Sequence, residues 1–191
     1  MVTSTRRRAT YADLEAAPPD RVAEIVDGEL LLRPRPRLRH AAAAAALGEE
    51  LGPPFRRGRG GPGGWLFLDE PELHFGPADA LDVLVPDMAG WRRERFANLD
   101  GDTAGIDVVP DWVCEVLSPS TAGIDRVRKA GIYRREGVAH VWLIDPAERT
   151  LEVLRLEVGR YVVADAAVGE VKVRAEPFAA IELDLALLWS P

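Results

Sequence analysis

Two short apolar segments in the second half of the chain flank a stretch that has the signals of a helix. Residues 111–117 have the composition of a buried strand, and Ser118-Pro119-Ser120-Thr121 then breaks it and supplies residues that cap helices. A helix is expected over residues 122–136, because Gly137 is a good stop signal. Residues 140–144 follow as a second buried strand. This order predicts an α/β fold, a mixed β-sheet flanked by helices.

The segments before this unit predict an N-terminal helix and hairpin added to the sheet. Asp27-Gly28 lies between two apolar runs, a strong hairpin signal over residues 21–32. The alanine-rich stretch 38–51 predicts a helix that ends at Gly52-Pro53-Pro54. The other expected elements are a short helix capped by Thr10, strands at 65–68, 72–75 and 81–85, an irregular excursion over 91–107, a hairpin around Gly159, and an apolar tail at 181–189. We expect one domain over residues 1–191, with a flexible start at 1–9.

The distribution of charge limits the partners of the chain. Its net charge of -7 argues against a protein that coats nucleic acid without specificity. Residues 1–60 nevertheless carry 11 Arg against 8 Asp and Glu, a net of +3, whereas the remainder carries a net of -10. A basic first third is compatible with a phosphate backbone as partner, and equally with a solvated surface.

Three features indicate a cytoplasmic protein without membrane contact. No apolar run approaches the ~20 residues needed to span a bilayer. The basic Arg6-Arg7-Arg8 is not followed by the apolar stretch of a signal peptide. Cys114 is the only cysteine, which excludes an internal disulfide and a multi-cysteine metal site, and its apolar surroundings predict a core thiol.

Lysine is rare in this chain. Of its 24 Lys and Arg residues only two are Lys, Lys129 and Lys172. A lysine in a suitable site can lose its proton near neutral pH, whereas arginine cannot. Lys129 therefore invites a functional interpretation. Because Asp125 precedes it by four residues, an ordinary surface ion pair on one helical face is the alternative.

Two acids on separate apolar runs suggest chemistry on phosphates. Glu115 shares one face of its expected strand with Asp111, but the two cannot easily share a metal, since four residues along a strand span ~13 Å and Mg²⁺ holds its oxygens at ~2.1 Å. Asp87 closes the apolar run 81–85 and is the best placed partner. Glu115 lies among Trp112, Val116 and other apolar residues, where a carboxylate is costly unless it is paired or bound to metal. A glutamate in a plain ion pair is the alternative.

These residues also carry a resemblance. The chain is similar to the Uma-two family of endonuclease-like bacterial proteins, with a restriction-endonuclease-like, PD-(D/E)XK core. The resemblance runs from about Tyr11 to Trp189 and rests on His40 at a helix start and on EIVDGEL at 24–30, VPD at 85–87, PDWVCEVLSPST at 110–121, DRVRKAGIY at 125–133 and VWLIDP at 141–146.

The resemblance implies a site. Asp87 and Glu115 would be metal ligands, and Glu24 a supporting acid. The lysine of the usual Glu-X-Lys is missing, because Leu117 stands there, and the family pattern implies that Lys129 on the next helix replaces it. His40, Ser118 and Asp125 are further candidates for substrate contacts.

Together these observations predict a Mg²⁺-dependent (or Mn²⁺-dependent) nuclease acting on DNA. The alternative is a nuclease-fold protein without catalysis that binds nucleic acid or protein. Trp65, Trp91 and the short strands around the Gly-rich stretch between Arg56 and Gly61 suggest more apolar surface than one small domain covers, from which we expect a homodimer.

Overall fold

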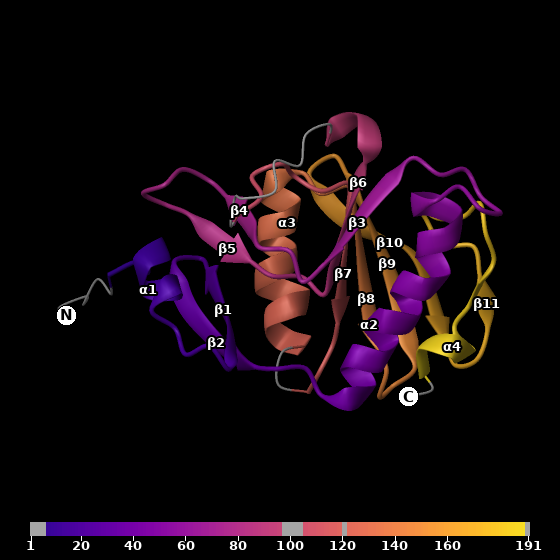
Figure 1. The fold of residues 1–191 in the computed structure, drawn as a ribbon, viewed down its shortest axis with the longest axis horizontal. Coiled ribbons are helices and arrows are strands. Elements are labelled where there is room, and N and C mark those ends of the chain that lie inside the picture. The colour runs from indigo at the N-terminus through magenta and orange to yellow at the C-terminus, as the bar shows by residue number, and fades with distance from the viewer. Residues whose placement is uncertain (1–6, 97–104, 120–121, 190–191) are drawn as a thin grey trace.

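The main layer of the molecule is a six-stranded sheet (Figure 1). The structure is a computed structural model that describes residues 7–96, 105–119 and 122–189. The sheet has the order β10-β9-β8-β7-β6-β3, and only β7 and β8 pair in parallel. The predicted mixed sheet is therefore confirmed. Its strands are β3 (Trp65–Asp69), β6 (Met88–Arg92), β7 (Trp112–Val116), β8 (His140–Asp145), β9 (Thr150–Glu157) and β10 (Arg160–Val168).

A second sheet is built around the N-terminal hairpin. Its order is β2-β1-β5-β4, with β1 (Arg21–Val26), β2 (Glu29–Pro34), β4 (Leu73–Phe75) and β5 (Asp82–Leu84). Asp27 and Gly28 form the hairpin turn with φ of 52° and 76°, and positive φ at both positions is what a type I′ turn requires. Helix α1 (Tyr11–Glu15) begins at a capping box of Thr10 and Asp13 and packs Leu14 against this sheet. The predicted hairpin and short helix are confirmed.

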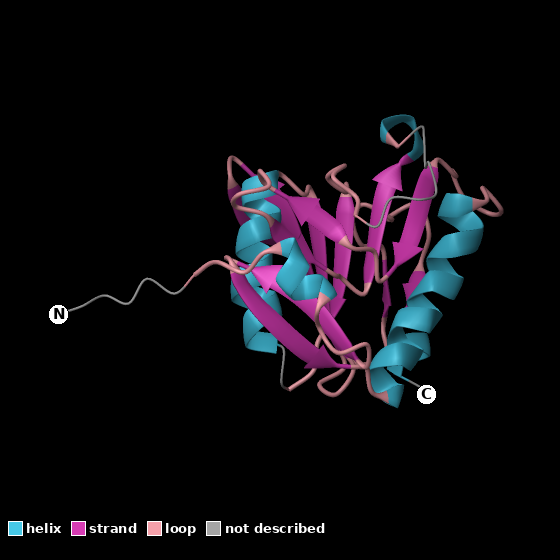
Figure 2. Cartoon of the chain, turned by 60° about the vertical axis from the view of Figure 1, so that its left-hand side comes forward, coloured by secondary structure: helices cyan, strands magenta, loops and turns pink. Residues whose placement is uncertain are grey.

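Helices cover both faces of the six-stranded sheet (Figure 2). Helix α2 (Leu38–Leu51) has the predicted bounds and packs Leu47 and Leu51 on the face that carries Trp112 and Cys114. On the other face lies a continuous helical segment, π-helical over η3 (Ile124–Lys129) and α-helical over α3 (Ala130–Glu136). It ends at Gly137, with φ 86°, as the sequence predicted.

The segment η3–α3 lies between the two sheets (Figure 1). Ile132 and Tyr133 belong to one apolar cluster with Val113 of the large sheet and Leu84 of the small one. Because strand side chains alternate, Val113, Glu115 and Leu117 face this helix, whereas Trp112, Cys114 and Val116 face α2. A side chain on η3 can therefore contact both sheets at once.

The C-terminal part of the chain packs against α2 and completes the apolar core on that face of the large sheet. The short strands β11 (Lys172–Val173) and β12 (Leu183–Asp184) pair with each other, and α4 (Ala186–Trp189) follows. Phe178 packs edge-on against Trp65, Trp112 and Trp142. None of the helices in the described ranges combines the length and hydropathy that a membrane crossing demands.

Two expectations about the middle of the chain are wrong. Strand β6 includes Trp91, where an irregular excursion was expected. After α2 ends at Leu51, as predicted, the chain continues through a π-helical turn, η1 (Gly52–Arg56). A 3-10 turn, η2 (Arg93–Arg95), follows β6. Trp65 and Trp91 are 1% and 0% exposed, so they fill the core and supply no apolar surface.

Some expectations fall outside the described residues. These are the flexible start over residues 1–6, the part of the excursion at 97–104, and the capping residues Ser120 and Thr121. Of the remaining start, Ala9 donates a backbone hydrogen bond to the carbonyl of Gly28.

Candidate active site

Glu115 is a buried acid at the centre of the large sheet. It lies on β7, is 1% exposed, and faces the η3–α3 segment. Its Oε1 accepts a hydrogen bond from the Tyr133 hydroxyl at 2.6 Å and lies 2.7 Å from the Lys129 ammonium. The acid is thus held from the helix by one cation and one hydroxyl, which offset the cost of burying a carboxylate.

Lys129 is fully buried between the two sheets. Its Nζ lies 2.9 Å from Glu24 Oε1 on β1 and 3.8 Å from Asp125 Oδ1, and it donates to the carbonyl of Val85 at 3.3 Å. Asp125 is itself only 1% exposed. The pair of Lys129 and Asp125 is therefore buried and not at the surface, where the alternative interpretation of the sequence placed it. Lys129 links the acids of both sheets.

Arg33 is the second cation of this cluster. Its Nη2 forms an ion pair with Glu24 Oε2 at 2.5 Å, but the angles of this contact do not fit a hydrogen bond. Among the described residues, Glu24 Oε2 has no hydrogen-bond partner. Its Nη1 lies 3.4 Å from Asp125 Oδ1. The other oxygen of Glu24 accepts from the Val85 backbone N–H at 2.8 Å. Three buried carboxylates, Glu24, Glu115 and Asp125, thus share the charges of Arg33 and Lys129.

Asp87 lies beside Glu115 across neighbouring strands. It immediately precedes β6, and because Met88 pairs with Cys114 in antiparallel register, Asp87 stands opposite Glu115. Its Oδ2 accepts from the Val116 backbone N–H at 2.6 Å. Its Oδ1 lies 2.5 Å from His40 Nε2, at the start of α2. The side chains of Asp87 and His40 are 14% and 16% exposed, so this pair is the accessible edge of the cluster.

Burial and charge set the protonation of the inner groups. Burial raises the pKa of Glu115 to about 8, the Lys129 ammonium opposes this rise, and Asp125 and Asp87 add to it. Burial alone would lower the pKa of Lys129, but Glu115 and Glu24 outweigh it and raise that pKa. Lys129 is therefore a permanent cation near neutral pH, and Glu115 is the group that can take up a proton.

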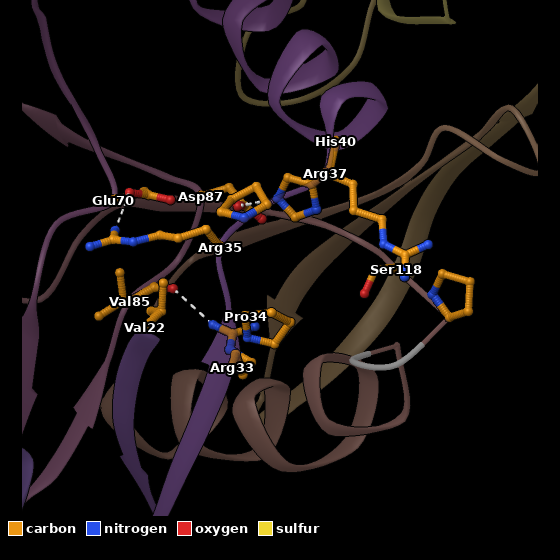
Figure 3. Close-up of a pocket in the computed structure, with 12 residues that line it drawn as sticks. Val22, Arg33, Pro34, Arg35, Arg37, His40, Glu70, Val85, Asp87 and Ser118 are labelled. Atoms are coloured by element: carbon orange, nitrogen blue, oxygen red, sulfur yellow. Dashed lines mark hydrogen bonds and ion pairs between the residues drawn. The ribbon is translucent and has the colours of Figure 1, made fainter. Parts of the chain in front are cut away.

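Asp87 and His40 line a cavity of about 200 Å³ (Figure 3). Arg33, Arg35 and Arg37 from the end of β2 and the following segment line it, and so does Ser118 after β7. Glu24, Glu115 and Lys129 are not among the lining residues and lie in the protein behind it. The cluster therefore has a buried inner part and an accessible mouth.

All seven predicted site residues gather in this region. Glu24, Glu115, Asp125 and Lys129 form the inner part, and His40, Asp87 and Ser118 line the cavity. Arg33 and Tyr133 also belong to the cluster and were not among the predicted site residues. Tyr133 follows Lys129 by four residues, a spacing that places both on one helical face, and this signal could have identified it. Arg33 opens the run Arg33-Pro34-Arg35-Pro36-Arg37, but no local pattern shows which of these arginines turns inward.

The side-chain oxygens available in this region are of the type that a hard divalent cation binds. Asp87 and Glu115 offer carboxylate oxygens from opposed positions, and the cavity beside Asp87 has room for water, which Mg²⁺ keeps as ligand. Within the described ranges, however, no group of three or more His, Cys, Asp or Glu is arranged to hold a metal. Loading a metal here would require Glu115 to loosen its contact with Lys129, and Asp87 its contact with His40.

The chain therefore combines a mixed sheet, helices on both of its faces, and buried acids beside a lysine. The chain belongs to the Uma2 family, described as "Putative restriction endonuclease", whose model matches residues 8–187. A crystal structure of a "putative nuclease belonging to DUF820" from Anabaena variabilis ATCC 29413 is similar to it, with a TM-score of 0.70 over 95% of this chain and 97% of that chain. At 20% sequence identity this likeness shows the shared fold. No curated protein matches the chain.

Proposed function

We propose that this protein is a metal-dependent nuclease that hydrolyses phosphodiester bonds of DNA. The observation that carries the proposal is the position of Lys129, whose buried ammonium lies 2.7 Å from Glu115, beside the strand that Asp87 precedes. A plain structural ion pair does not require a lysine in contact with acids of two sheets next to an open cavity. The description of the family and that of the structural neighbour support nuclease activity as the core of this proposal.

Asp87 and Glu115 are the residues that would hold Mg²⁺ or Mn²⁺, which supplies an activated water and offsets charge on the phosphate. Because its pKa is raised, Lys129 does not act as a base. It acts as a fixed positive charge that orients the attacking water and stabilises the charge that develops on the phosphate oxygens. Glu24 positions this ammonium from the opposite sheet, and Tyr133 positions the Glu115 carboxylate.

A second candidate is a nuclease-fold protein that binds nucleic acid or protein without cleaving it. The observation that favours it is that the acids already have partners. Both oxygens of Asp87 are engaged, by His40 and by the Val116 N–H, and Glu115 Oε1 is shared by Lys129 and Tyr133. An acid cluster that is satisfied in this way can persist as a purely structural feature.

Cleavage of a labelled DNA substrate distinguishes the two candidates. The wild type should cleave in Mg²⁺ or Mn²⁺ and stop when EDTA is added. Lys129→Arg should be inactive, because the larger guanidinium fills the space of the attacking water. Lys172→Arg is the matched control, since Lys172 is 60% exposed and pairs with Glu182 far from the cavity. Full activity of Lys129→Arg would refute the mechanism, and DNA binding without cleavage by the wild type would favour the second candidate.

A further inference from the structure

The groups proposed for catalysis lie below the protein surface. Glu115 is 1% exposed and Lys129 is fully buried, and access to Asp87 is through a cavity of about 200 Å³. A cavity of roughly 150 Å³ holds one benzene molecule, whereas the major groove alone of a DNA duplex is roughly 12 Å wide. By this measure the cavity accommodates a group about the size of one nucleobase and excludes a double helix.

The walls of this cavity suit the faces of a nucleobase. Val22, Val85 and the prolines Pro34, Pro36 and Pro119 provide apolar lining. Proline restricts the backbone, so the cavity is preformed and needs little ordering when a ligand enters. Apolar surfaces on either side of a base replace the stacking that the base loses when it leaves a duplex.

Two arginines stand at the mouth with donors available for phosphate. Arg35 is 59% exposed, donates to the carbonyl of Pro19 at 3.3 Å, and lies only loosely, at 3.9 Å, from Glu70. Arg37 is exposed, and no carboxylate of the described residues lies within 4.0 Å of its guanidinium. Figure 3 shows the two side chains directed to opposite sides of the Asp87–His40 pair. A guanidinium binds phosphate oxygens in a bidentate way, so two consecutive phosphates could be held on either side of Asp87.

The adjoining groove offers no comparable path for a second strand. It has a volume of about 680 Å³, runs along α2, and shares His40, Glu70 and Asp87 with the cavity. Glu49 and Asp69 also line it, and together with Glu70 and Asp87 they outnumber Arg56 and Arg57. The phosphates of a DNA strand therefore meet net positive charge at the mouth lined by Arg35 and Arg37, and net negative charge in the groove beyond it.

We infer that the cavity takes one unpaired nucleotide, with its base between the proline walls and its flanking phosphates on Arg35 and Arg37. The preferred substrate is then an unpaired DNA strand, such as a single strand or an overhang, and the interior of a duplex is disfavoured. This inference rests on the proposed nuclease function for the cleavage of one of these two phosphates beside Asp87, but its binding part stands without cleavage.

Binding in EDTA tests the inference separately from catalysis. Fluorescence anisotropy compares one labelled oligonucleotide as a single strand, as a blunt duplex, and as a duplex with an overhang. The single strand and the overhang should bind roughly tenfold more tightly than the blunt duplex, which has to extrude a nucleotide. Equal or tighter binding of the blunt duplex overturns the inference, as does a lack of binding to all three.

Arginine variants locate the binding. Arg35→Ala and Arg37→Ala should each weaken single-strand binding by roughly tenfold, the loss expected for one charge-assisted contact. Each should also lower the slope of log affinity against log salt by about 0.7. Arg39→Ala is the matched control, because Arg39 is exposed on the same segment but does not line the cavity. An equal loss in Arg39→Ala contradicts the proposed path.

Cleavage assays in Mg²⁺ separate this inference from the proposed function. Equal cleavage of single-stranded and duplex DNA would overturn the inference and leave the nuclease in place. Single-strand binding that depends on Arg35 and Arg37, without any cleavage, would support the inference and remove the nuclease.

Discussion

Replacing Lys129 with methionine tests the role of its charge in the fold. Methionine keeps an unbranched stem as far as Cε and removes the ammonium. The change leaves Glu24, Glu115 and Asp125, each 0–1% exposed, with Arg33 as the nearest remaining cation. Removing one partner of a buried ion pair costs about 3–5 kcal/mol. For a chain of this length each kcal/mol lowers Tm by about 2–4 °C, so Tm should fall by roughly 6–20 °C.

The loss should depend on pH in a defined direction. Burial raises the pKa of Glu115 from 4.5 to about 8 in the folded protein, so between these values the folded state holds more protons than the unfolded state. Stability from this group therefore falls as pH rises through that window. Without Lys129 the pKa of Glu115 rises further, because the cation that opposed the shift is gone. The deficit of Lys129→Met should thus be smallest in acid and largest at alkaline pH.

Urea unfolding in EDTA measures this effect at about pH 5 and about pH 9, on either side of the window. Lys172→Met is the control and should stay within about 0.5 kcal/mol of the wild type. The double variant Lys129→Met/Glu115→Gln should recover part of the loss, because it removes one unpaired acid together with the cation. A loss below about 1 kcal/mol that is independent of pH would refute this account of Lys129.

Three further predictions concern pH, packing and association. Glu115→Gln should flatten the fall in metal-free stability between pH 4.5 and about 8, and an unchanged slope in a urea series would contradict the raised pKa. Gly90→Ala should cost about 1–3 kcal/mol in thermal unfolding, because its Cβ would lie 2.9 Å from Phe67 and 3.1 Å from Trp112, whereas Gly123→Ala, with no atom within 4 Å, should cost nothing. We still expect a homodimer, now through the edge strand β10, whose Val163 and Val168 are 62% and 70% exposed; light scattering should give a dimeric mass for the wild type and a monomeric mass for Val163→Lys.

Local signals were enough for the elements whose sequence period or turn chemistry is strong. Helix α2 has its predicted bounds because alanine and leucine favour helix throughout 38–51. The hairpin at Asp27-Gly28 follows from the positive φ that its turn requires. Strand β6 was missed because it is buried on both faces and shows no alternation. Its Gly90 lowers strand propensity, yet close packing by Phe67 leaves no room for a side chain there.

The candidate site shows the same division. That Asp87 and Glu115 belong together could be argued from two apolar runs, because Asp87 closes one of them and Glu115 interrupts the other. The partners of these acids could not be predicted from the sequence, because they depend on tertiary contacts. His40 approaches Asp87 from 47 residues away, and Arg33 approaches Asp125 from 92. The full burial of Lys129 also arises only when η3 is enclosed between two sheets.

Calorimetric titration with Mn²⁺ or Mg²⁺ tests the central claim, that Asp87 and Glu115 form a metal site. The wild type should show binding heat, and Asp87→Ala and Glu115→Gln should each lose it. Asp111→Ala is the matched control, because Asp111 precedes the same strand but is held by Arg95 and the Arg92 N–H. It should bind metal as the wild type does. Equal metal heat in the wild type and Asp87→Ala, or no heat in the wild type, would contradict the account.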